Sequence, residues 1–137
     1  MHIHEWAAVV AATVLALVLV FQLLLVAGAP FGHAAWGGQH QVLPTHLRWA
    51  SAAAVAIIGL MAWVVLARAG LVPPGGEHVA IRTATWVFVG FFAVNTVANV
   101  VSTSSVERYV MTPATLLMVA CLVTLALSPA GVAEVAS

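Results

Sequence analysis

Four long apolar runs constrain this chain more than any other feature. They lie at about 6–28, 49–67, 83–101 and 110–127. Each is close to the ~20 residues that an α-helix needs to cross the hydrocarbon of a bilayer. The runs are continuous rather than alternating in polarity, which argues against membrane-spanning strands. We therefore predict an all-α membrane protein, a four-helix transmembrane bundle with up-down-up-down topology, and a frayed tail at 128–137.

The charge content agrees with this fold class. Only 6% of the 137 residues are charged, whereas an ordinary soluble domain carries about 25%. Lipid must therefore cover most of the surface, and we predict one integral membrane domain over residues 1–137. The formal net charge is zero, so no electrostatic argument points to nucleic acid, and we expect no nucleic-acid partner. The single cysteine, Cys121, has no partner for a disulfide within the chain.

The longest interruption between two apolar runs is the stretch at 28–48. It is too apolar for a free loop and too broken for a span, because Pro30, the pair Gly37-Gly38 and Pro44 divide it. We predict an interfacial or partly re-entrant segment that covers one end of the bundle, since irregular backbone at membrane depth needs protein or water partners.

Four spans also determine which connections share a membrane face. The 28–48 stretch and the 102–109 connector lie on one face, whereas both termini and the 68–82 loop lie on the other. Arginines are divided equally between the two faces, so the positive-inside rule gives a tie. We expect the termini to be cytoplasmic, because Arg48 and Arg108 have roles in local structure.

Polar side chains inside the spans are few, and several have matching depth. Gln22 lies about 9 Å and Asn95 about 10 Å inside the same face, from the rise of a helix. We expect both amides to turn inward, within direct or one-water reach of each other. The predicted ligand-binding set is Gln22, Arg48, Ser51, Asn95, Asn99 and Ser102. Two interpretations stay open: a polar pocket for a ligand, and interhelical hydrogen bonds that only hold the bundle together.

Charged groups at this face suggest an ion pair. Arg48 opens the second span and Glu107 follows the third, so we expect them to pair, with Arg108 as the alternative partner for Glu107.

The acid/base candidates for an enzyme are Glu107 and His46. We predict neither a metal site nor a cofactor, because histidine gaps of seven and six, with Pro44 inside the second, are not ligand spacing, and no nucleotide fingerprint is present. Thr112 and Pro113 predict a capped helix start.

Two blocks resemble a known family. GAPFGHAAWGGQHQVLPTHLR at 28–48 is similar to a G-A-P-W-G…G-G…L-P…R segment, and SSVERYVMTP at 104–113 is similar to an E-R…P block. Together they resemble a family of small bacterial four-span membrane proteins whose activity is uncharacterised. The resemblance implies only that both blocks belong to one architecture. We expect the protein to lie in the bacterial inner (plasma) membrane.

Three functions are compatible with these residues. The leading one is a non-enzymatic binding or accessory module that holds a lipid or small apolar molecule by its polar head. The second is a membrane enzyme acting on a lipophilic substrate, and the third is a purely structural subunit of a larger complex. The expected partners are the bilayer, such a ligand, and further copies of the chain that associate through small-residue faces.

Overall fold

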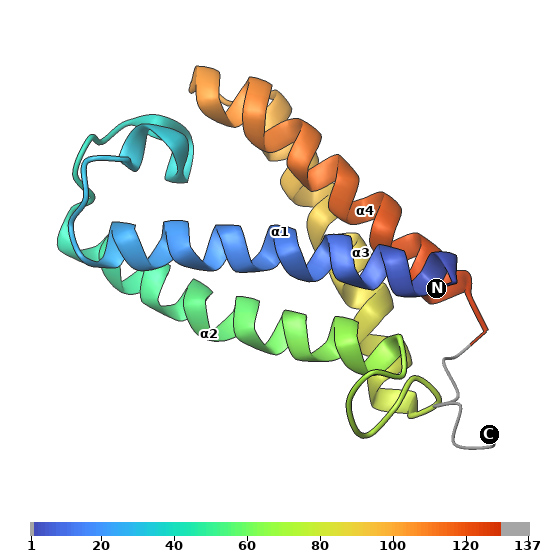
Figure 1. The fold of residues 1–137 in the computed structure, drawn as a ribbon. Helices are drawn as coiled ribbons and strands as arrows, with labels where there is room; N and C mark the ends of the chain where they lie inside the picture. Colours follow the sequence, from blue (N-terminus) through green and yellow to red (C-terminus); the bar gives the residue numbers. More distant parts are fainter. Residues whose placement is uncertain (1, 130–137) are drawn as a thin grey trace.

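The computed structural model describes residues 2–129, and this part of the chain is built from four long helices (Figure 1). They are α1 (Ile3–Val26), α2 (Thr45–Arg68), α3 (Val79–Val100) and α4 (Thr112–Leu127), with a π-helical turn, Glu107–Met111, directly before α4. No strand occurs between residues 2 and 129, so the predicted all-α architecture with four helices is confirmed. All but the first two residues of the tail at 128–137 lie outside the described residues.

Each helix is long and apolar enough to cross a membrane, when α4 is counted with its π-helical turn. The chain is therefore consistent with a small integral membrane protein. Large apolar side chains lie on the surface of the helices: Leu17 is 67% exposed and Val94 is 71% exposed. Side chains of this kind in contact with water would oppose folding, whereas lipid tails solvate them.

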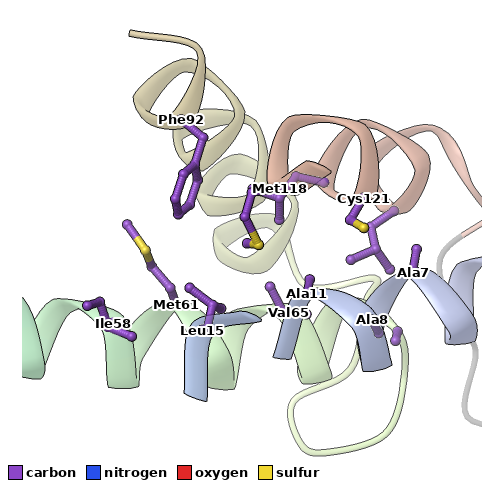
Figure 2. Packing of buried hydrophobic residues seen from close by; sticks show 13 residues of the cluster. Ala7, Ala8, Ala11, Leu15, Ile58, Met61, Val65, Phe92, Met118 and Cys121 are labelled. Atoms are coloured by element: carbon purple, nitrogen blue, oxygen red, sulfur yellow. The ribbon is translucent and has the colours of Figure 1, made fainter. Parts of the chain in front are cut away.

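The core lies where α1 crosses the other helices. α1 packs against α2 and α4, and α3 packs mainly against α4. Small side chains on α1 make this approach possible, because Ala8 and Ala11 are completely buried. Leu15 and Met118 fill the space between the helices from opposite sides (Figure 2).

The start of α4 differs from the prediction. Thr112 is not a helix cap, because its backbone is already helical, with φ −60° and ψ −52°. Its N–H donates to the carbonyl of Glu107, five residues earlier, and its hydroxyl donates to the same carbonyl at 3.2 Å. The wider π-helical turn accommodates Pro113, which has no N–H and would clash with a regular preceding turn.

The connection from α1 to α2 contains two short 3₁₀ turns, Gly32–Ala34 and Trp36–Gly38. Ala35 and Leu43 from this connection pack with Leu25 of α1 in a small apolar cluster. Gly38 has a φ of +74°, and a Cβ added there would lie 2.5 Å from the Cβ of Ser104. Glycine is therefore required at this position for the connection to approach the residues between α3 and α4.

Candidate functional site

A buried carboxylate joins the two connections at one end of the bundle. Glu107, in the π-helical turn, is only 8% exposed. One oxygen, Oε1, accepts a hydrogen bond from the backbone N–H of Gly37 at 3.1 Å. The other, Oε2, accepts one from the hydroxyl of Ser102. Both carboxylate oxygens therefore have donors, and one of these donors comes from a segment 70 residues away in sequence.

Two hydroxyl groups beside Glu107 extend this contact. Ser104 donates to the backbone carbonyl of His33, and Thr103 donates to the carbonyl of Gly37 at 3.4 Å. We call the set formed by Ser102, Thr103, Ser104 and Glu107, with the backbone of His33 and Gly37, the polar clasp. The clasp holds the α1–α2 connection against the start of the π-helical turn, which agrees with the predicted proximity of these two segments.

The predicted ion pair between Arg48 and Glu107 is wrong. No ion pair joins Glu107 to Arg48 or Arg108 within the residues that the structure describes, since every bond to its carboxylate is from Gly37 or Ser102. The Nε of Arg48 donates instead to the carbonyl of Val26 at 3.0 Å. Each side chain thus bonds an uncharged backbone or hydroxyl group and not the opposite charge. The alternative partner, Arg108, lies over the ring of Tyr109, 5.4 Å from its centroid.

Arg48 faces a cavity of about 320 Å³ at the start of α2. The lining residues are Val26, Thr45, Arg48, Trp49 and Ala52. The bond from Nε to Val26 orients the guanidinium, and Nη1 and Nη2 make no hydrogen bond with residues 2–129. Gly28, with a φ of +91°, lies directly behind the guanidinium. The arrangement presents a fixed cationic fork beside an exposed tryptophan.

The other five predicted ligand-binding residues do not line this cavity. Ser51 is completely buried and accepts a hydrogen bond from Nε1 of Trp36 at 3.0 Å. Ser102 belongs to the polar clasp, and Asn99 is buried at the same end of α3. Ser51 and Ser102 therefore attach the α1–α2 connection to α2 and to the clasp, so they hold structure in the manner of the second interpretation.

The two amides expected to meet do not form a direct bond. Oε1 of Gln22 is buried and has no hydrogen-bond partner among the described residues. Asn95 is half-buried on α3. Equal depth along two helices is not sufficient for contact, because α1 packs mainly on α2 and α4 rather than on α3. A contact through one water stays a prediction.

A second hollow runs along α1 on another side. This groove has a volume of about 500 Å³ and opens at the surface. It is lined by Leu17, Val20, Phe21, Leu24, Pro30, Phe31, His33, Ala34, Val106 and Met111. One lining residue, His33, is linked to the clasp, because its carbonyl accepts a hydrogen bond from Ser104. The lining is apolar apart from His33, which suits an acyl chain or a second apolar group.

The acid/base candidates have different surroundings. Glu107 uses both oxygens in the clasp, whereas His46 is exposed on the first turn of α2. Between residues 2 and 129, no group of three or more histidine, cysteine, aspartate or glutamate side chains is placed to hold a metal. The sequence reasoning missed the donor role of Gly37; its signal is the Gly37-Gly38 pair, whose backbone can approach a carboxylate closely.

Comparison with protein families, curated proteins and solved structures found no match. The resemblance of the two blocks to a bacterial membrane family therefore stays a prediction.

Proposed function

We propose that this chain is a non-enzymatic membrane protein that binds a lipid with an acidic head at Arg48. The observation that carries the proposal is the Arg48 cavity, where the guanidinium is oriented by Val26 and its two Nη groups are left for a ligand. A guanidinium offers several N–H groups in a planar fork, which matches a carboxylate or a phosphate.

The surroundings of Arg48 favour an amphipathic ligand. Trp49 is 72% exposed beside the cavity, and tryptophan prefers the depth of lipid headgroups. Val26 and Ala52 offer an apolar wall for the first part of an acyl chain. The cavity also lies at the N-terminal end of a long helix, where the helix dipole favours negative charge.

The proposal includes a membrane arrangement. The helices cross the bilayer up-down-up-down, the connection at 27–44 lies at one interface, and the termini are cytoplasmic. Two contacts support the alternation: Arg48 at the start of α2 bonds Val26 at the end of α1, and Arg68 at the end of α2 bonds Ala126 at the end of α4. Labelling of single cysteines, introduced after Cys121→Ala, from each side of sealed vesicles tests this arrangement.

Native mass spectrometry tests the binding site. We expect the wild-type protein to retain phosphatidylglycerol in preference to phosphatidylcholine, and Arg48→Gln to lose this preference. Arg108→Gln is the matched control, because Arg108 is an exposed arginine that stacks on Tyr109 and lines neither hollow. Equal retention of both lipids by the wild type, or an unchanged preference in Arg48→Gln, contradicts the proposal and favours a purely structural subunit.

The groove along α1 favours a second candidate, binding of an apolar molecule without an acidic head. Leu24 lines the groove and Leu23 does not, although both are exposed on the same helix. If the groove is used, Leu24→Trp displaces a bound apolar probe and Leu23→Trp does not. Equal binding by the two variants removes this candidate.

A further inference from the structure

Arg68, the last residue of α2, is a buried charge with unused donors. Only 3% of its surface is exposed. Its Nη2 donates to the carbonyls of Ala126 and Ser128, at 3.3 and 2.8 Å, and so holds the end of α4. Its Nε and Nη1 are buried and have no hydrogen-bond partner among the described residues. Two N–H-bearing nitrogens of a cation are therefore left without acceptors.

Such an arrangement is costly unless an acceptor of opposite charge is supplied. A guanidinium keeps its charge in proteins, and a buried charge without a partner destabilises a fold. No ion pair is formed by Arg68 in the part of the chain between residues 2 and 129. Carbonyl groups of α4 satisfy one nitrogen but do not neutralise the charge. The chemistry of the site calls for an anion.

The surroundings of Arg68 favour a phosphate group. Arg82, in the first turn of α3, lies close enough to interact with Arg68 electrostatically, and it is exposed. Two arginines of like charge near one another repel unless an anion lies between them. Glu77 also lies within electrostatic range, but it is exposed and makes no ion pair with Arg68.

Gly76, in the α2–α3 loop, packs directly on the side chain of Arg68. A Cβ added at Gly76 would lie 2.9 Å from Nη1 of Arg68 and 2.4 Å from its carbonyl oxygen. Gly76 is itself buried, so the α2–α3 loop packs closely on Nη1. This loop also contains Gly75, whose φ is +90°. Because Arg68 and Gly76 are both buried, an oxyanion reaches the guanidinium only when this loop moves.

We propose that Arg68 and Arg82 form a binding site for a phosphate group, at the end of the bundle opposite the Arg48 cavity. The phosphate belongs to a lipid headgroup or is free inorganic phosphate, and both present the same oxygens to the two arginines. Arg68 supplies the buried N–H donors, and Arg82 supplies the second positive charge at the entrance. Glu77 opposes binding through its negative charge.

Thermal unfolding of delipidated protein in detergent tests this site. Sodium phosphate is compared with sodium chloride at equal ionic strength, and nanodiscs of phosphatidylglycerol are compared with phosphatidylcholine. We expect phosphate or phosphatidylglycerol to raise Tm, and Arg82→Gln to weaken the apparent affinity roughly two- to fivefold, as for an exposed charge. A shift with the free salt identifies inorganic phosphate as sufficient, and a shift only in phosphatidylglycerol identifies the headgroup.

Arg82→Gln carries the test because it leaves the bonds from Arg68 to α4 intact, whereas Arg68→Gln removes them as well. Arg108→Gln is the control that keeps the phosphate-dependent shift. Arg82→Gln is also compared with its parent in an Arg48→Gln background, where the proposed headgroup site is removed, so failure of the Arg48 site is distinguishable from failure of this one. Glu77→Gln should bind phosphate more tightly. No anion-dependent shift in the wild type, or an equal shift in Arg82→Gln, overturns the proposal. A drop in Tm of Glu77→Gln without phosphate also overturns it, because Glu77 is then the counter-charge.

Discussion

The two ends of α2 have the same residue and different surroundings. At each end an arginine bonds the C-terminal carbonyls of another helix: Arg48 bonds Val26 of α1, and Arg68 bonds Ala126 and Ser128 near the end of α4. Arg48 is half-buried and faces a cavity, whereas Arg68 is 3% exposed. A cation near helix C-termini is favourable in both places. What differs is which part of each guanidinium a ligand can reach.

The covering segments explain this difference. At Arg48, the α1–α2 connection contributes Gly28 beside the guanidinium, while its middle is bound to the π-helical turn through the bond from Gly37 to Glu107. Over Arg68, the α2–α3 loop lies directly on the side chain through Gly76. The Arg48 end of α2 therefore suits a ligand that arrives from the membrane. The Arg68 end, which is covered by the α2–α3 loop, holds α2 and α4 together.

The largest effect on stability is expected at Arg68, at the C-terminal end of α2. Arg68→Ala removes two charge-assisted hydrogen bonds and a buried side chain, so it should lower the free energy of unfolding by about 3 kcal/mol. Arg108→Ala, at an exposed position, should change it by less than about 0.5 kcal/mol. Denaturation in mixed micelles measures both variants. Equal stability of the two would show that Arg68 does not join α2 to α4.

A smaller effect is expected in the polar clasp. Glu107→Ala leaves the N–H of Gly37 and the hydroxyl of Ser102 without their acceptor, at a cost of about 1–3 kcal/mol. Glu107→Gln keeps one amide oxygen as an acceptor and should lose less. Hydrogen exchange reports the change locally, because the amide of Gly37 should exchange faster in Glu107→Ala. Unchanged exchange at Gly37 in that variant would contradict the clasp.

The smallest effect compares two neighbouring glycines in the connection. Both have positive φ, +82° at Gly37 and +74° at Gly38, so either alanine variant is strained by about 1 kcal/mol. Only at Gly38 does the added Cβ also meet Ser104, whereas nothing lies within 4 Å of it at Gly37. Gly38→Ala should therefore unfold at a lower temperature than Gly37→Ala. The reverse order would mean that the connection does not pack against Ser104.

The sequence predicted the helices well, because uninterrupted apolar runs leave no other membrane-compatible structure for these residues. The sequence was a poorer guide to the hydrogen-bond partners of the polar side chains. Arg48 and Glu107 lie at the same end of the bundle as expected. Each binds uncharged backbone or hydroxyl groups, however, and a pattern of charged residues does not reveal such partners. The contact of Gln22 with Asn95 rested on depth alone, and depth does not determine which helix lies opposite. Thr112 failed as a cap because a π-helical turn precedes it.

The central claim is that a lipid head binds the fork of Arg48. Cross-linking with phosphatidylglycerol that carries a photoreactive group near its head, followed by peptide mapping, tests it most directly. We predict labels concentrated on the residues around the cavity, at Val26, Trp49 and Ala52, and a loss of these labels in Arg48→Gln. Labels spread evenly over exposed positions such as Val94 of α3, or an unchanged pattern in Arg48→Gln, would contradict the claim.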